Sequence, residues 1–435
     1  MQTRKIFVAA LVLLMAVCLS GCGTFNMDTD AMISPPELTG DMYPIAQALS
    51  KSIKGEYQLK YPSLGDRRSA IMLEDIDDDG VKEAFAFYST AEDETTNMHI
   101  NIICRSGKGY KSVADMAIVA GGVERVDFCD LDGDNKEEII VGWEIYGSSE
   151  KQICVYSLEG GQAAQLLSEK YTGFICCSIA SEGNQLLIQQ LNTSEMNNTA
   201  VLYAGSDNGL KKIGSCMLDP EVKTVSSIAQ SQLATGNNAV YIDEIKGAGA
   251  VTEVLIFANG ELKNPLLNIE GNIENISTLR AATIQSKDIN GDGSLEIPVA
   301  TNLPNAAGGE ELLYYTNWCA FDGENLITRQ IMIVNTIDGY SISIPDDLAG
   351  RIAVLKDTEN HRRVIFRYNA ETGEVGDRLA TVSVISKKQW DKKGFDRMSM
   401  FELARNDEFV FAGAVNLAAE NPIDEKTLKK MFTVG

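Results

Sequence analysis

The residues with the clearest chemical potential are acidic and amide side chains in a nine-residue pattern that occurs three times. The copies begin at Asp75, Asp130 and Asp288. In each copy, side-chain oxygens stand at positions 1, 3 and 5, and a carboxylate stands at position 9. Hard cations such as Ca²⁺ take roughly six to eight oxygen ligands. A tight turn can direct alternate side chains and the carbonyl of position 7 toward one ion, so the pattern predicts calcium-binding loops.

Positions 4 and 6 support a tight turn. They are Asp78 and Gly80 in the first copy and mainly Gly or Asn in the others. Gly and Asn tolerate the left-handed backbone that such a turn requires. An EF-hand begins in the same way but continues with a Glu at position 12 and a helix. Position 12 here is Ala86, Val141 and Val299, within strand-like apolar runs, so we expect loops that lead into strands. A metal-free Asx turn remains the alternative.

The elements that position these loops follow from their spacing. Asp130 lies 55 residues after Asp75, and Asp288 lies 158 residues after Asp130, close to three further steps. Short apolar runs that end in an aromatic residue or Cys also recur six times, each followed by a turn rich in Gly, Asn or Asp. Their markers are Cys104, Tyr156, Tyr203, Phe257, Phe321 and Tyr368. Strand-length runs between such turns indicate hairpins, and the period indicates a propeller or solenoid.

The sequence therefore predicts an all-β fold, a six- or seven-bladed β-propeller of four-stranded blades. Closing such a ring requires the chain ends to meet. Near residues 183 and 240, where further acidic loops are expected, the sequence has SEGNQ and IDEIKGAG, which we interpret as degenerate copies. A β-sandwich with accidental spacing remains the alternative.

The loops and the strands after them resemble the FG-GAP/VCBS repeats of β-propeller proteins. In that family a D-x-D-x-D-G-x-x-[DE] loop lies between strands of a blade, and the resemblance implies structural Ca²⁺. Position 9 is Glu in all three copies, where the family often has Asp. The longer side chain of Glu can coordinate the cation differently or more weakly than Asp does. The implied ligands are Asp75, Asp77, Asp79, Val81 (carbonyl) and Glu83; Asp130, Asp132, Asp134, Lys136 (carbonyl) and Glu138; and Asp288, Asn290, Asp292, Ser294 (carbonyl) and Glu296.

The amino terminus has the features of an export signal. Arg4 and Lys5 precede an uninterrupted apolar run, Ile6–Leu19. A helix of that length spans about 21 Å, short of the ~30 Å hydrocarbon core of a bilayer. The profile therefore indicates a secretory signal rather than a transmembrane helix.

The run ends in Leu19-Ser20-Gly21-Cys22, which resembles the lipobox of bacterial lipoproteins. The resemblance implies cleavage before Cys22 and a diacylglyceryl group on its thiol. Two acyl chains anchor a protein stably in a membrane, so membrane lipid becomes a partner and the location becomes the outer side of the bacterial cell membrane. An ordinary signal peptide with an incidental cysteine remains the alternative.

The sequence thus predicts five segments along the chain. They are a lipoprotein signal peptide (1–21), a lipidated N-terminus and tether (22–40), a short helix and linker (41–59), the β-propeller (60–418), and a C-terminal short helix and tail (419–435).

Composition limits the function classes. Asp and Glu number 61 against 38 Lys and Arg, for a net charge of −23. This excess of acid argues against nucleic acid as a partner and favours divalent cations. Histidine occurs twice, as His99 and His361, so a His-rich zinc site or a Ser-His-Asp enzyme has little material. Beyond Cys18 and Cys22, seven cysteines remain; we expect mostly buried free thiols, with one or two disulfides as the alternative.

These features favour an extracytoplasmic, membrane-anchored binding or adhesion module without catalytic activity. Its ligand would be an unidentified extracellular glycan or protein. Two alternatives remain open from the sequence: a polysaccharide lyase or hydrolase, in which two carboxylates serve as acid and base, and an envelope assembly scaffold.

Overall fold

The computed structural model describes residues 42–90, 97–180, 182–206, 209–270, 272–308, 311–397 and 399–434. The predicted signal peptide, Cys22 and the tether lie outside the described residues. Within them, the strands form six antiparallel sheets of four or five strands. The all-β class and the six-bladed alternative are confirmed.

The first three sheets, blades 1 to 3, are built from consecutive strands. In blade 1, both β1 and β2 pair with β3. The strands are β1 (Tyr57–Leu59), β2 (Ile71–Glu74), β3 (Glu83–Thr90), β4 (Asn97–Ser106) and β5 (Gly109–Val119) in blade 1; β6 (Gly122–Cys129), β7 (Glu138–Glu144), β8 (Lys151–Glu159) and β9 (Gln162–Tyr171) in blade 2; and β10 (Gly173–Cys177), β11 (Gln185–Asn192), β12 (Asn197–Ser206) and β13 (Gly209–Met217) in blade 3.

Blades 4 to 6 follow the same rule, with two additions near the C-terminus. The last strand joins blade 5, and in blade 6 β26 lies between β24 and β25. The strands are β14 (Val222–Gln232), β15 (Asn238–Lys246), β16 (Gly249–Ala258) and β17 (Glu261–Lys263) in blade 4; β18 (Ile297–Leu303), β19 (Leu313–Phe321), β20 (Leu326–Asn335), β21 (Tyr340–Ile344) and β27 (Phe432–Val434) in blade 5; and β22 (Ile352–Asp357), β23 (Arg362–Tyr368), β24 (Val375–Ser386), β25 (Phe401–Arg405) and β26 (Phe409–Val415) in blade 6.

Three short helices accompany the sheets in the described part of the chain. The expected N-terminal helix is α3 (Met42–Ser52), whose Ile45 and Leu49 are buried against blade 1. The helix α4 (Lys387–Trp390) follows β24. The C-terminal α5 (Glu425–Met431) is capped by Asp424, whose Oδ1 accepts a hydrogen bond from the N–H of Thr427, and it packs into the core between blades 5 and 6.

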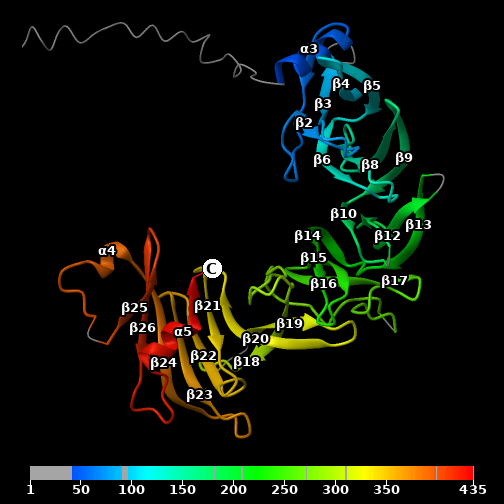
Figure 1. Ribbon diagram of the computed structural model, residues 1–435. Helices are drawn as coiled ribbons and strands as arrows, with labels where there is room; N and C mark the ends of the chain where they lie inside the picture. Colours follow the sequence, from blue (N-terminus) through cyan, green and yellow to red (C-terminus); the bar gives the residue numbers. More distant parts are fainter. Residues whose placement is uncertain are drawn as a thin grey trace, which may run out of the picture.

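The blades follow one another along an arc, with blade 1 at one end and blade 6 at the other (Figure 1). The N-terminal strand β1 pairs within blade 1, and the C-terminal strand β27 pairs with β21 of blade 5. Among the described strands, none is shared between the first and the last blade. The two ends of the described chain therefore pair within different blades, because the C-terminal segment turns back to blade 5.

The hydrophobic core lies between adjacent blades. Residues of β7 alternate: Ile139 and Val141 face blade 1, and Ile140 faces blade 3. A strand with side chains on alternating faces can fill two cores at once, so inner strands such as β7 are buried throughout most of their length. Comparable clusters join blades 3 and 4, blades 4 and 5, and blades 5 and 6. Stability therefore rests on nearest-neighbour packing, as in repeat proteins.

The seven described cysteines are free thiols. Four of them, Cys129, Cys154, Cys177 and Cys319, are buried. They occupy strand positions, where an unpaired cysteine acts as a small hydrophobic residue.

Candidate metal centres

Each acidic loop leads into a strand of its blade. The first loop joins β2 to β3, and the second joins β6 to β7. The third loop leads into β18 of blade 5. In the described part of this blade no full strand comes before the loop, and a single antiparallel bridge between Lys287 and Glu296 takes its place. The expected step from loop to strand is therefore present in all three copies, and no EF-hand helix follows any of them.

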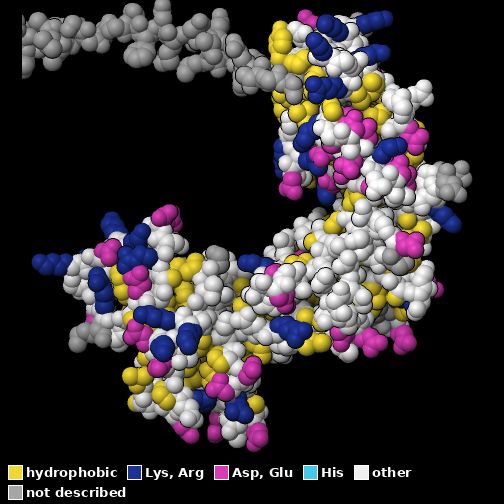
Figure 2. Space-filling model, in the orientation of Figure 1, with side chains coloured by type: hydrophobic (Ala, Val, Ile, Leu, Met, Phe, Trp, Pro, Cys, Tyr) yellow, Lys and Arg dark blue, Asp and Glu magenta, His cyan; other side chains and the backbone are white. Residues whose placement is uncertain are grey.

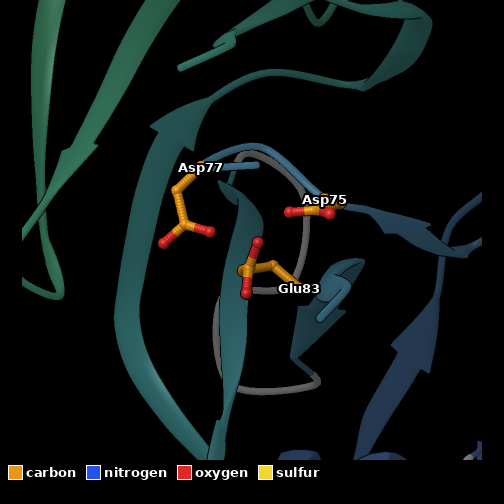
Figure 3. Close-up of side chains that lie close together, drawn as sticks. All are labelled: Asp75, Asp77 and Glu83. Carbon is orange, nitrogen blue, oxygen red and sulfur yellow. The ribbon is translucent and has the colours of Figure 1, made fainter. Parts of the chain in front are cut away.

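In the first loop, Asp75 organises the turn. Its Oδ1 and Oδ2 accept hydrogen bonds from the N–H groups of Asp79 (3.2 Å) and Gly80 (2.9 Å). Asp78 and Gly80 adopt φ values of 56° and 83°, the left-handed backbone expected at positions 4 and 6. Oxygen atoms of Asp75, Asp77 and Glu83 all lie within 4.8 Å of one another, and their side chains surround one space beside the loop (Figure 3).

The second loop repeats this geometry. Asp130 accepts hydrogen bonds from the N–H groups of Gly133 (2.6 Å) and Asn135 (3.1 Å), and those two residues have φ values of 81° and 65°. Oxygen atoms of Asp130, Asp132 and Glu138 again lie within 4.8 Å of one another. Two separate blades thus place three carboxylates around a common point.

The third loop has the same backbone but a different side-chain arrangement. Asp288 accepts hydrogen bonds from the N–H groups of Gly291 (2.7 Å) and Gly293 (2.9 Å). Position 3 is Asn290, whose Nδ2 donates to Asp292 Oδ2 and Glu296 Oε1, both at 2.9 Å. These hydrogen bonds occupy one oxygen of Asp292 and one of Glu296. The three-carboxylate groups found in the described residues are those of the first two loops, and this loop has an amide at position 3 instead.

The position-9 glutamates are buried beneath their loops, with exposed fractions of 5% for Glu83, 3% for Glu138 and 1% for Glu296. One carboxylate oxygen of each accepts a hydrogen bond from the main-chain N–H of position 2, at 2.8–3.3 Å. Burial, followed by the charge of neighbouring aspartates, raises the pKa of Glu83 and of Glu138 to about 7. A bound cation would relieve both unfavourable effects.

The carboxylates at position 5 have a local role in this arrangement. Asp79, Asp134 and Asp292 each accept a hydrogen bond from the main-chain N–H of position 7, at 2.7–2.8 Å. Lys136 also places its ammonium group 3.4 Å from Asp134 Oδ2. The donor set of the first two loops, made of oxygens around buried Glu83 and Glu138, fits a hard cation such as Ca²⁺.

The first two loops also join neighbouring blades. The N–H of Gly205 in β12 donates to the carbonyl of Leu131 at 3.0 Å, and Asn184 Nδ2 donates to the carbonyl of Asp130 at 2.9 Å. Asp77, Asp79 and Glu83 line a hollow of about 460 Å³ together with Gly160 and Gly161 from the β8–β9 turn of blade 2. The acidic loops therefore lie at the joints of the arc.

The structure corrects the positions of the degenerate copies. In blade 3 the corresponding loop is indeed near residue 183, between β10 and β11, but residue 240 lies inside β15. The matching turn of blade 4 is 233–237, with the sequence LATGN, which carries no acid. The sequence reasoning also missed Gln185, which occupies the place of the position-9 glutamates: its Oε1 accepts hydrogen bonds from Ile179 and Ala180 N–H, each at 3.0 Å. A polar residue directly before the apolar run LLI was the available signal.

Comparison with known proteins gives a distant likeness in fold. No family model matches the chain, and no curated protein matches it. Solved structures that align with it include Bacillus licheniformis rhamnogalacturonan lyase PL11 (9% identity, 82% of this chain and 90% of that chain, TM-score 0.30). A second is the periplasmic gluconolactonase PpgL of Pseudomonas aeruginosa (11% identity, 75% of this chain and 95% of that chain, TM-score 0.29). A third is Saccharomyces cerevisiae Sqt1 (10% identity, 73% of this chain and 88% of that chain, TM-score 0.30). TM-scores this low carry no argument about activity.

No helix within the described ranges is both long and apolar enough to cross a membrane.

Proposed function

We propose that this chain is an extracytoplasmic lipoprotein whose blades are held by Ca²⁺ and present a binding or adhesion surface without catalytic activity. The observation that carries the proposal is the pair of three-carboxylate groups at the same position of blades 1 and 2. Their sequence pattern resembles that of the FG-GAP/VCBS repeats. The ligand of the surface would be an extracellular glycan or protein.

The role of calcium in this proposal is structural. Each loop that brings together three carboxylates also makes main-chain contacts to the next blade, through Ile76 in blade 1 and Leu131 in blade 2. An ion that fixes the loop fixes those contacts as well. An arc without a shared closing strand depends on such joints, because each blade is supported by its sequence neighbours alone.

The membrane anchor rests on the Leu19-Ser20-Gly21-Cys22 motif. A diacylglyceryl group on Cys22 would hold the chain at the extracytoplasmic surface of the cell membrane. The following residues, up to about residue 40, are polar and include Pro35 and Pro36. Such a segment would act as a spacer between the lipid and blade 1.

The test of the metal sites is titration calorimetry of the full-length chain with CaCl₂ after treatment with EGTA. The variant Asp77→Asn removes one charge from the three-carboxylate group of blade 1 and should weaken binding there at least tenfold. Asp78→Asn is the matched control, because position 4 lies next to Asp77 in the same loop but outside the three-carboxylate group. Asn also tolerates the left-handed backbone at this position. Equal loss of binding in both variants would contradict the assigned site.

The test of the function is a glycan array together with a pull-down from the native cell envelope, each carried out with Ca²⁺ and with EGTA. We expect Ca²⁺-dependent retention of a glycan or a protein. Turnover of cell-wall or plant polysaccharides by the purified chain would contradict the non-catalytic assignment.

A further inference from the structure

A cavity outside the acidic loops lies at the joint between blade 5 and blade 6. It encloses about 240 Å³ between β18, β19, β20, β22 and residues 280–284. Much of its wall is apolar, including Val299, Leu303, Ile333 and Val354. Mostly apolar pockets with a few polar groups bind small molecules, and those for drug-sized ligands measure roughly 300–1,000 Å³. This cavity therefore suits a smaller organic molecule.

The charged groups of this cavity are all cationic. Arg280, Lys356 and Arg363 line it, and no Asp or Glu is found among its described lining residues. The chain as a whole carries a net charge of −23, so a cavity lined by cations alone has the opposite sign to the rest of the protein. Across the visible surface, by contrast, acidic and basic side chains are interspersed (Figure 2). A cavity lined by cations alone attracts anions.

Two of the three cations already have carboxylate partners. Arg280 Nη2 lies 3.1 Å from Asp243 Oδ1, and Lys356 Nζ lies 2.7 Å from Glu311 Oε1. Neither of these pairs needs a ligand for its neutralisation. The third cation differs from both.

Arg363 is buried, with 8% of its surface exposed. Its Nη1 donates a hydrogen bond of 3.3 Å to the carbonyl oxygen of Arg362, and none of the ion pairs among the described residues includes it. Asp338 is engaged by Asn335 Nδ2 at 2.7 Å and by His361 Nδ1 at 2.9 Å. A buried charge is costly unless it is paired. The remaining N–H groups of the Arg363 guanidinium have no partner among the described residues, so they are available to an anion that enters the cavity.

We propose that this cavity binds a small organic acid, whose carboxylate pairs with Arg363 and whose body lies against the apolar wall. The planar guanidinium group matches a carboxylate in two parallel hydrogen bonds. An inorganic anion would leave the apolar wall without a contact, which favours an organic one. The proposal is independent of the calcium loops.

The experiment is titration of the full-length chain with benzoate and with glucuronate, which carry the same carboxylate on an aromatic and a sugar body. Benzamide and glucose are the neutral counterparts, and inorganic phosphate tests a bare anion. We expect saturable binding of at least one carboxylate, at least tenfold tighter than its neutral counterpart. The variant Arg363→Gln should weaken this binding at least tenfold, and Arg363→Lys should retain part of it.

Arg362→Gln is the matched control, because Arg362 is the preceding residue of β23, is exposed, and pairs with Asp357 instead. It should bind the acid as the unaltered chain does. A crystal of the unaltered chain soaked in 4-iodobenzoate gives a readout that needs no variant: iodine should appear in the cavity beside Arg363. The proposal is overturned by the absence of carboxylate binding, by equal binding of the neutral counterpart, by binding of phosphate alone, or by iodine located elsewhere.

Discussion

The main-chain N–H of Glu137 donates a hydrogen bond of 2.7 Å to the carbonyl oxygen of Ile76. Glu137 is position 8 of the second acidic loop, and Ile76 is position 2 of the first. The two loops that gather three carboxylates are therefore in direct contact. The N–H of Ile76 also donates a hydrogen bond of 3.3 Å to Glu83 Oε2. A cation held by Glu83 would therefore stabilise the same residue, Ile76, that bonds to blade 2.

Removal of calcium should lower the thermal stability of the full-length chain. A ligand that binds the folded state at 100 times its Kd stabilises it by about 2.7 kcal/mol per site. With two occupied loops we expect the melting temperature in EGTA to fall by at least a few degrees, as measured by calorimetry. Addition of Ca²⁺ should restore it. An unchanged melt, together with no metal in elemental analysis, would speak against calcium in these loops.

Gly205→Ala should destabilise the joint between blades 2 and 3. A Cβ atom at Gly205 would lie 2.3 Å from Asp132 Cα and 2.8 Å from the Leu131 carbonyl oxygen. Overpacking of this kind costs roughly 1–3 kcal/mol, and it should also disturb the three-carboxylate group of Asp130, Asp132 and Glu138. Urea unfolding measures the first effect, and Ca²⁺ titration measures the second. Gly109→Ala is the control, since a Cβ there meets no atom within 4 Å; equal losses in both variants would contradict the steric argument.

Cys22→Ala should release the chain from the membrane of the producing bacterium. The reason is that a thioether-linked lipid needs the thiol, and the two acyl chains supply the stable anchoring. Partitioning into Triton X-114 and mass spectrometry of the N-terminal fragment provide the measurement. Cys18→Ala, which lies inside the apolar run, should keep the lipid. A protein that remains in the detergent phase without the Cys22 thiol would rule out this anchor.

The acidic loops could be predicted because their geometry is local. Asp75, Gly80 and Glu83 lie within nine residues, so the turn follows from spacing alone, whereas the burial of Glu83 became visible in the structure. The sequence also predicted left-handed backbone at positions 4 and 6, which all three loops adopt. What spacing did not show is that Asn290 turns its amide hydrogen toward Glu296, because residue type does not fix the orientation of an amide.

The long-range features of the fold could not be predicted in this way. Whether a strand at the C-terminus closes the ring depends on which sheet edge it meets, and β27 meets β21. The loop of blade 4 carries no acid, so no signal marked it. Arg363 has an ordinary strand sequence around it, and its lack of a partner becomes visible when blades 5 and 6 are placed together.

Two buried glutamates of blade 4 should make stability decrease as pH rises. Glu244 accepts hydrogen bonds from Gln189 Nε2 (2.5 Å) and Asn198 Nδ2 (2.9 Å) across the joint to blade 3, while its Oε2 has no partner. Burial raises the pKa of Glu244 to about 8 and that of Glu253 to about 7. Between the unfolded pKa, near 4.3, and these values, the unfolded chain ionises while the folded chain holds its protons. The stability they provide is fully present below about pH 4 and is lost progressively up to about pH 8.

Glu244→Gln should therefore flatten this decline, because an amide keeps a polar group in place without a charge to bury. At pH 8.5 we expect the variant to be more stable than the unaltered chain by about 1–3 kcal/mol in urea unfolding, and at pH 5 nearly equal to it. Glu159→Gln, an exposed position at the end of β8, is the control and should leave the pH profile unchanged. A variant that is equally or less stable at pH 8.5 would show that Glu244 is ionised at no cost. In that case the joint between blades 3 and 4 would tolerate a buried negative charge, and its polar groups would have to supply the compensation.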